Sequence, residues 1–311
     1  MATIPEPHLA LGDVAARQLA DTKKTPPTML SISPRWLVRL LPWVAVEAGI
    51  YRLNKVRDES RVLTACSQRE DERDLPETFV DYETNPREYF LSSVTTVVDV
   101  HTRISDLYGH PFDQVHEQLR LATETIKERQ ESELLHNPDY GILTNVAPGQ
   151  RITTLAGPPT PDDLDELITH VWKEPAFFLA HPRAIAAFER EATRRGVPPV
   201  TVTLFGSPVI TWRGIPVVPS NKLEVENGKT QILLLRTGEA RQGVVGLYRA
   251  DAAAEYGLGL SVKFMGISRK AIASYLISLY CSVAILTDDA AAVLEDVEVD
   301  RYHEYGHVYQ A

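Results

Sequence analysis

Cysteine is scarce in this sequence: Cys66 and Cys281 are the only two among 311 residues, they lie far apart, and no CxxC pair occurs. A disulfide framework needs several cysteines, and a zinc knuckle needs closely spaced pairs. We therefore expect two reduced thiols and no structural disulfide, as is usual for a cytoplasmic protein.

Positively charged residues are also fewer than negatively charged ones. The chain has 32 lysines and arginines against 42 aspartates and glutamates, which gives a formal net charge of −10. A protein that coats nucleic acid needs basic side chains to offset the phosphates. The charge balance therefore argues against a nucleic-acid partner and is better suited to protein partners.

No long apolar run is present. The longest uncharged stretch, residues 271–287, has 17 residues and includes serines and tyrosines, whereas a membrane-spanning helix needs about 20 predominantly apolar residues. Residues 1–11 lack the basic start and apolar core of a secretory signal. We expect no membrane insertion, and a membrane-associated protein is kept as an alternative.

Motifs typical of enzymes are incomplete. His303, Glu304 and His307 match the HExxH pattern, in which two histidines on successive helical turns hold zinc and the glutamate activates water. Gly306 weakens a helix there, and we expect no third ligand from the four residues that follow His307. We predict no catalytic residue, no cofactor and no metal site. A zinc-dependent hydrolase that uses these three residues remains the alternative.

The first third of the sequence is poorly suited to bury itself. Residues 1–33 are rich in proline, serine and threonine around one short apolar stretch, so we expect an arm that orders on a neighbour. Residues 50–85 begin with alternating apolar and polar residues, continue through a charged stretch and return at residues 78–82. This pattern predicts a long, charged β-hairpin that lies across another subunit.

Between these two segments we predict a helix over residues 34–49. Ser33 is its expected N-cap and Pro34 its first residue. Pro42 is expected to kink this helix or to end it early. Trp36 and Trp43 fall on one face, where large aromatic side chains are suited to packing.

Helix signals continue in the next segment. Residues 85–88 supply a cap, an N1 proline and a capping-box glutamate, and the apolar residues after them recur at spacings of three and four. They predict a helix that stops at Gly109. A longer amphipathic helix is expected over residues 112–136, with charged residues such as Glu124 and Glu128 on a solvated face.

Two further helices are predicted after the caps Thr160 and His181, each of which is followed by proline. From Val200 onward, short apolar runs alternate with turn residues, as in β-strands. Residues 275–285 alternate with period two, but serines also recur there every four residues, so both strand and helix remain open. Helices and strands are largely segregated, which predicts the α+β class.

Four long segments of the sequence, residues 103–135, 158–196, 203–220 and 278–299, resemble the family 2A encapsulin shell proteins, including their mycobacterial members. The order of elements also resembles the tailed-phage major-capsid (Hong Kong 97-like) fold. The resemblance covers nearly the whole chain. It implies a non-enzymatic shell subunit.

Carried onto this numbering, the resemblance implies an N-terminal arm (1–33), a first helix (34–49), an E-loop (50–85), a P-domain with its spine helix (86–150), an A-domain (151–285), and a closing P-domain strand with the C-terminal tail (286–311). It further implies an icosahedral shell of about sixty copies. The implied cargo is a cysteine desulfurase that serves sulfur metabolism or storage in the cytoplasm. As candidates for subunit interfaces we name the aromatic residues Trp36, Trp43, Tyr51, Phe79 and Tyr82.

Overall fold

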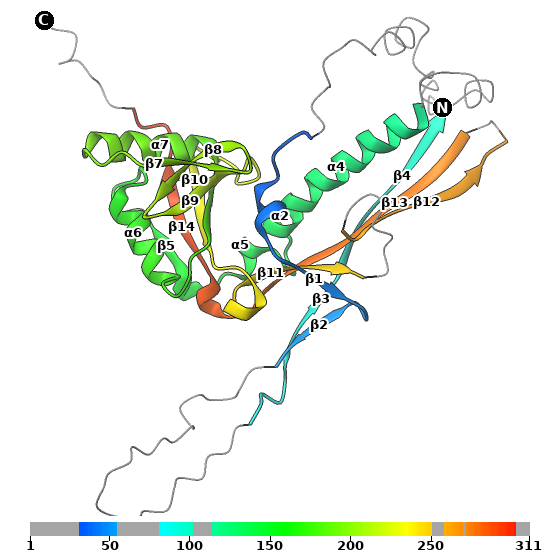
Figure 1. The fold of residues 1–311 in the computed structure, drawn as a ribbon, viewed down its shortest axis with the longest axis horizontal. Coiled ribbons are helices and arrows are strands. Elements are labelled where there is room, and N and C mark those ends of the chain that lie inside the picture. The colour runs from blue at the N-terminus through cyan, green and yellow to red at the C-terminus, as the bar shows by residue number, and fades with distance from the viewer. Residues whose placement is uncertain (1–30, 55–80, 102–113, 251–257, 270–271, 303–311) are drawn as a thin grey trace, which may run out of the picture.

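The computed structural model describes residues 31–54, 81–101, 114–250, 258–269 and 272–302. Two bodies make up the fold (Figure 1): an elongated body in which one long helix follows a narrow sheet, and a compact body in which helices pack on a wider sheet. A short hairpin of β2 (Ile50–Leu53) and β3 (Arg87–Phe90) leaves the elongated body.

The elongated body is built around β13 (Ile272–Ile285), the longest strand. It pairs antiparallel with β4 (Ser92–His101) on one side and with β11 (Val244–Arg249) and β12 (Leu260–Ile267) on the other. Strand β1 (Trp43–Val46) adds to β11 in parallel. The long helix α4 (Gln114–His136) lies along this sheet, where its apolar residues Leu119 and Ile126 contact Ile277 and Leu279.

The compact body contains a seven-stranded mixed sheet in the order β5-β14-β10-β6-β9-β8-β7. Its strands are β5 (Arg151–Thr153), β6 (Phe177–Ala180), β7 (Val200–Leu204), β8 (Ser207–Trp212), β9 (Ile215–Pro219), β10 (Lys229–Leu235) and β14 (Ala291–Glu298). Helices α6 (Pro161–His170) and α7 (Pro182–Arg194) cover one face. The other face packs on α2 (Trp36–Leu40), α5 (Ile142–Asn145) and the end of α4. Short 3-10 turns lie at Pro148–Gln150, Glu239–Arg241 and Asp288–Ala290.

Burial on both faces explains the continuous apolar runs of the central strands. Phe178 and Leu234 belong to the cluster under α6 and α7, whereas Leu179 and Leu235 belong to the cluster under α2 and α5. Because successive side chains of a strand point to opposite faces, a strand covered on both sides needs apolar residues throughout.

Several helix predictions are confirmed. Helix α4 occupies most of the predicted range 112–136. Helix α6 begins at Thr160 with a capping box, in which the Thr160 amide donates to the Asp163 carboxylate at 2.7 Å and the Asp163 amide donates to the Thr160 hydroxyl at 3.3 Å. Helix α7 begins after His181, whose ring nitrogen accepts from the Arg183 amide.

The helix predicted between residues 86 and 109 is wrong in its described part, which forms β3 and β4. Residues 92–101 are mostly valine, threonine and serine, and β-branched side chains favour strands. All ten residues of β4 pair with β13. This long ladder outweighs the local capping signature at residues 85–88.

The helix predicted over residues 34–49 is confirmed only as α2, which ends at Leu40, and the expected early end at Pro42 is confirmed. The part predicted beyond Pro42 is wrong, because β1 begins at Trp43. Arg35, in a left-handed conformation (φ 48°), stands in the N-cap position without a side-chain cap bond. The return strand of the hairpin is β3, whereas most of the predicted return at 78–82 lies outside the described residues.

The predicted boundary at residue 285 does not coincide with the division of the strands between the two sheets. Strands β11, β12 and β13 lie in the elongated body, although they fall within the predicted A-domain range 151–285. Strand β14, predicted to close the P-domain, joins the compact sheet between β5 and β10. The open choice for residues 275–285 is settled in favour of a strand.

Candidate assembly surfaces

A buried polar cluster fixes the point where residues 1–30 join the described structure. We call it the clasp; its members are Ser33, Arg35, Glu124, Glu128 and Lys222. The Ser33 hydroxyl lies 2.8 Å from both carboxylate oxygens of Glu128. Arg35 pairs with Glu124 at 2.7 Å and with Glu128 at 3.0 Å, and Lys222 pairs with Glu128 at 2.8 Å. Burial favours a raised pKa for Glu128, but the hydrogen bonds from Lys222, Ser33 and Arg35 outweigh it and lower that pKa.

The clasp corrects the prediction that Glu124 and Glu128 lie on a solvated face, since both are at least nine-tenths buried. A third carboxylate, Glu131, is 1% exposed and accepts a hydrogen bond from the Leu37 amide at 3.1 Å. Burial raises the pKa of Glu131 to about 7, against the lowering effect of the Leu37 hydrogen bond. The spacing of these glutamates on α4 was visible in the sequence, but their partners at residues 33–37 were not.

Two of the five interface candidates pack inside their own chain. Trp36 is 2% exposed and belongs to the core of its own chain, which leaves little of its ring for a neighbour. Its ring stacks on Phe205 with centroids 6.2 Å apart, and the Arg39 guanidinium lies about 5 Å from both ring centroids. Trp43 is half-buried; its indole donates to the Val38 carbonyl at 2.9 Å, and its ring closely approaches Gly246.

The remaining candidates belong to the hairpin region. Tyr51 pairs with Tyr89 across β2 and β3, and its hydroxyl donates to Glu239 at 2.8 Å. Burial, reinforced by Glu239, raises the pKa of Tyr51 to about 12. Tyr82, in the described segment that leads into β3, is 60% exposed. Phe79 lies outside the described residues.

A buried arginine holds the junction between the two sheets. Arg236, 1% exposed, binds Asp289 through two hydrogen bonds of 2.7 and 3.2 Å and also donates to Thr287. Lys173 pairs with the same aspartate at 3.0 Å. Although burial alone favours a raised pKa, these partners hold the pKa of Asp289 far below its usual range. Arg236 lies 53 residues before Asp289 in the sequence, so no local signal indicates this pair.

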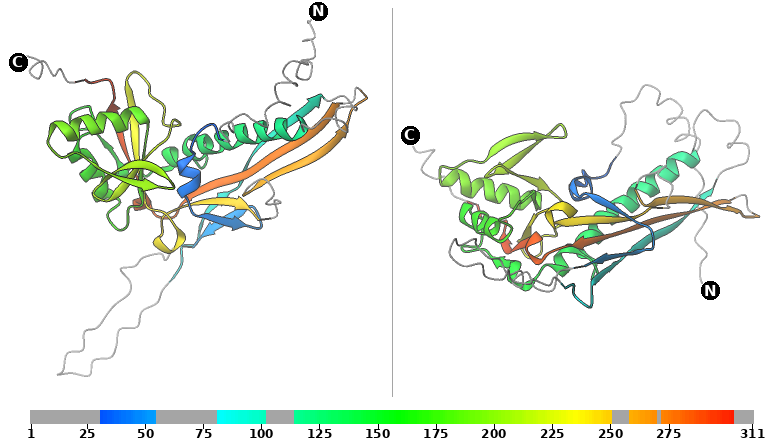
Figure 2. Two further views of the ribbon diagram at one scale, coloured as in Figure 1. Left: turned by 45° about the horizontal axis from the view of Figure 1, so that its top comes forward. Right: turned by 60° about the horizontal axis from the view of Figure 1, so that its bottom comes forward.

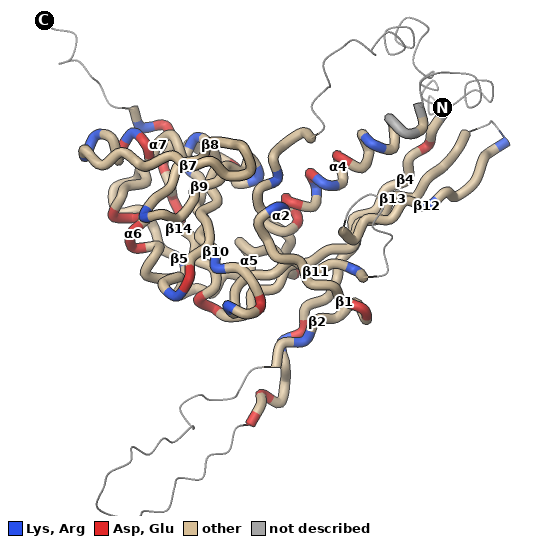
Figure 3. The backbone as a smooth tube through the Cα atoms, viewed as in Figure 1, with Lys and Arg blue, Asp and Glu red and all other residues tan. Residues whose placement is uncertain are grey.

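Charge is distributed unevenly over the two bodies (Figure 3). Lysine, arginine, aspartate and glutamate are frequent on α4 and on the compact body, whereas β4, β12 and β13 carry few charges along their length. Exposed apolar side chains lie near the far end of the β12–β13 hairpin: Phe264, Met265 and Ile267 are each more than half exposed. A sheet with such a surface is suited to contact with other protein.

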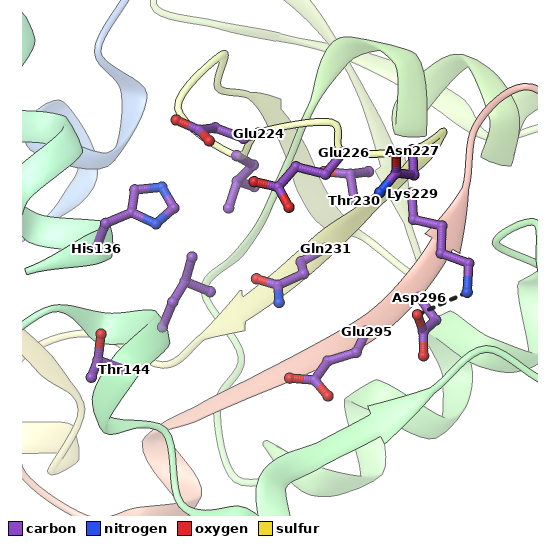
Figure 4. Close-up of a pocket in the computed structure, with 12 residues that line it drawn as sticks. His136, Thr144, Glu224, Glu226, Asn227, Lys229, Thr230, Gln231, Glu295 and Asp296 are labelled. Atoms are coloured by element: carbon purple, nitrogen blue, oxygen red, sulfur yellow. Dashed lines mark hydrogen bonds and ion pairs between the residues drawn. The ribbon is translucent and has the colours of Figure 1, made fainter. Parts of the chain in front are cut away.

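A cavity of about 600 Å³ lies between the end of α4, α5 and strands β10 and β14 (Figure 4). Its lining is mainly polar, but two of its carboxylates are already paired: Glu295 with Arg151 at 2.6 Å and Asp296 with Lys229 at 3.0 Å. Its open carboxylates, Glu224 and Glu226, come from one loop. This lining contains no recognisable pairing of nucleophile and base.

Within the described ranges, no three His, Cys, Asp or Glu residues are grouped so that they could hold a metal ion. His303, Glu304 and His307, the HExxH-like residues, lie outside those ranges, so the structure does not test them. A search of the described helices for one that is long and apolar enough to cross a membrane gives no candidate.

The sequence was also compared with known proteins. The family model for the SrpI-like type 2A encapsulin shell protein matches residues 51–301. The type 2A encapsulin shell protein SrpI of Synechococcus elongatus is 69% identical over 96% of this chain and 97% of its own length. The chain belongs to the SrpI-like type 2A encapsulin shell protein family. As a member of a family of structural shell proteins, this encapsulin shell protein is not an enzyme, and it assembles with copies of itself into a nanocompartment.

Solved structures similar to this encapsulin shell protein include an encapsulin and capsid proteins. It matches a chain of the holo-SrpI encapsulin complex from Synechococcus elongatus with a TM-score of 0.81 and 65% identity, over 96% of this chain and 99% of that chain. The capsid of a native GTA particle matches with a TM-score of 0.59 at 16% identity, over 93% and 100% of the two chains. The predicted tailed-phage major-capsid fold is therefore confirmed.

Proposed function

We propose that this encapsulin shell protein forms an icosahedral shell of about sixty copies in the cytoplasm, and that the shell encloses a cysteine desulfurase for use in sulfur metabolism or storage. The observation that carries the proposal is the 65% identity to a chain of the holo-SrpI encapsulin complex over 96% of this chain. The acidic net charge of −10 supports a protein cargo rather than a nucleic acid. The desulfurase itself rests on family resemblance.

The arrangement of the described elements supports an assignment of each part of the subunit to a domain of the capsid-like fold. We assign α4 with β4, β12 and β13 to the P-domain, the seven-stranded compact body to the A-domain, and the β2–β3 hairpin to the base of the E-loop. In this assignment the E-loop leaves from a two-stranded stem with four paired positions on each strand. A two-stranded hairpin has little stability alone in water, so its extension gains from lying on a neighbouring copy.

Within this scheme, Tyr82 is the interface candidate with the best support. It is 60% exposed in the segment that leads into β3, whereas Tyr51 is engaged with Glu239 of its own chain. Aromatic residues that are open on a subunit commonly become anchors when the interface closes. Phe79 stays a proposal on sequence grounds.

Electron microscopy of the purified protein, combined with mass spectrometry of whatever copurifies, tests the shell and the cargo separately. Closed particles of uniform diameter are expected, with a cysteine desulfurase as the main copurifying enzyme. A species of 34.7 kDa as the only state in solution would refute the shell. Closed particles filled with a different enzyme would leave the shell standing and refute the desulfurase.

Deletion variants test the arm and the E-loop. One variant lacks residues 1–30 and leaves the clasp intact; a second replaces residues 55–80 by a short glycine-serine turn between β2 and β3. Each should remain folded, because both variants keep every described member of the four buried clusters, yet each should assemble less well than the full chain. If both deletions together form normal shells, neither segment has the proposed role.

A further inference from the structure

Strand β7 ends the compact sheet with an edge that is open in the described structure. It pairs antiparallel with β8 from Val200 opposite Thr211 to Leu204 opposite Ser207. Among the residues that the structure describes, no strand pairs with its other side. The β7–β8 hairpin reaches from the compact body toward α2 in the views of Figures 1 and 2.

The turn of this hairpin determines which backbone groups face the open edge. Phe205 and Gly206 form a two-residue turn with positive φ at both positions, 48° and 81°. In such a turn the flanking residues form a hydrogen-bonded pair, and hydrogen-bonded pairs then alternate along the ladder. Residues 200, 202 and 204 therefore bond to β8. The amide and carbonyl groups of Thr201 and Thr203 point away from it, toward the open edge.

An apolar surface lies beside these open groups. Val200 is 68% exposed and Val202 is 40% exposed, and both project from the same face of the strand. Val202 pairs with Val209, which is buried in the core cluster under α2, and Leu204 packs on that cluster. The apolar face of the sheet thus extends past its covered part, and an added strand with apolar residues at alternate positions would complete it.

The strand lacks the features that usually protect an edge. Natural edge strands are commonly shortened, bent by a bulge, or marked by lysine or proline, so that they do not pair with other chains. The edge strand β12 of the elongated sheet has two of these features, Lys263 and a register shift at Phe264–Gly266. The five residues of β7 are Val-Thr-Val-Thr-Leu, in continuous register with β8.

We propose that the open edge of β7 is a β-augmentation site, which is filled in the assembled shell by an extended segment of a second copy of this chain. The inference rests on membership of a self-assembling shell family, which makes further copies the partners present at every subunit. The hairpin is also presented in a fixed position, because Phe205 at its tip stacks on Trp36 and Arg39 covers both rings. Such preorganisation lowers the entropy lost on binding.

The length of chain outside the described residues allows a neighbouring copy to supply the strand. Residues 1–30 and 55–80 are 30 and 26 residues long, and an extended chain spans about 3.3 Å per residue. Either segment could reach across an adjacent subunit. Backbone hydrogen bonds to Thr201 and Thr203 would provide affinity, and contacts with Val200 and Val202 would provide register.

A proline substitution tests the site. Thr203→Pro removes the amide that faces the open edge and leaves the hydrogen bonds to β8 in place, as proline is tolerated on the free side of an edge strand. Thr203→Val keeps the amide and the strand preference and serves as the matched control. At a protein concentration near the midpoint of wild-type assembly, Thr203→Pro should reduce the particle fraction roughly tenfold or more, and Thr203→Val should not. Normal particle yield from a folded Thr203→Pro variant overturns the proposal.

Hydrogen exchange on the wild-type chain tests, without a variant, whether the edge of β7 is occupied in the assembled shell. The Thr201 and Thr203 amides should exchange roughly hundredfold more slowly in cargo-free shells than in dissociated subunits. Equal exchange in the two states would show that the edge stays open and would refute the site. Slow exchange that appears only in cargo-loaded shells would identify the cargo as the occupant and refute the second copy.

Discussion

Replacement of Glu131 by glutamine should make the stability of this shell protein less dependent on pH. Glu131 is buried beneath α2, and its pKa is raised from 4.5 to about 7 in the folded chain. The folded state therefore holds the proton more tightly than the unfolded chain. The resulting stabilisation is complete below pH 4.5 and is lost as the pH rises toward 7.

The size of this effect follows from the same values. A rise of the pKa from 4.5 to about 7 corresponds to about 3 kcal/mol, at about 1.4 kcal/mol for each pH unit. In the wild-type chain the Leu37 amide nitrogen lies 3.1 Å from a carboxylate oxygen of Glu131. Glu131→Gln keeps an oxygen that can accept this hydrogen bond and removes the negative charge. At pH 8 the variant should be up to about 3 kcal/mol more stable than wild type, and the difference should vanish near pH 4.5.

Urea unfolding at pH 5, 6, 7 and 8, at one fixed protein concentration, measures the difference between variant and wild type, so that contributions shared by both chains cancel. Glu128→Gln is the matched control. Its pKa is lowered by its partners in the clasp, so this variant should be less stable than wild type at pH 8. Parallel curves for wild type and Glu131→Gln across the whole pH range would refute the reasoning about Glu131.

Three further predictions concern single side chains. Asp289→Asn should lower the free energy of unfolding by about 3 kcal/mol, measured in urea at pH 7, because it leaves Arg236 buried without its counter-charge; an unchanged unfolding midpoint would contradict the role of this pair. Thr160→Ala should lower the free energy of unfolding by about 1 kcal/mol through loss of the capping box, whereas Thr160→Ser should largely preserve it. Trp36→Ala should lower the thermal unfolding temperature, because a ring of the core is lost. Tyr82→Ala should leave the dissociated subunit as stable as wild type but reduce the particle yield measured by light scattering. A destabilised Tyr82→Ala subunit, or a Trp36→Ala subunit of unchanged stability, would contradict these roles.

Local sequence signals predicted those elements whose ends are set by nearby residues. The amphipathic helix α4 and the capped helices α6 and α7 lie close to their predicted positions. In each of these helices, the first turn or the apolar stripe is encoded within a few residues. The capsid-like fold was predicted as well, through the resemblance of long segments rather than through periodicity.

Elements that depend on distant partners were not predictable in the same way. In strand β4, the spacings of three and four among the apolar residues predict a helix, although Val94, Val98 and Val100 also lie at the even spacings of one strand face. The partner strand β13, which decides for a strand, lies more than 170 residues away. The clasp joins α4 to residues 33–35 and to Lys222, each about 90 residues from α4 in the sequence. Nothing near Glu128 indicates that a serine, an arginine and a lysine will surround it.

Strand β13 takes part in three separate hydrophobic cores. Its residues Ile277 and Leu279 pack under α4, Ala284 lies in the cluster beneath β1 and β11, and Val283 and Ile285 lie in the cluster shared with the compact body. Because one strand packs into the clusters of both bodies, it opposes rotation of one body against the other. The angle between them is set when the chain folds, and each copy carries that angle into the shell. We therefore expect the angle between the two bodies of a single subunit to contribute to the curvature of the finished particle.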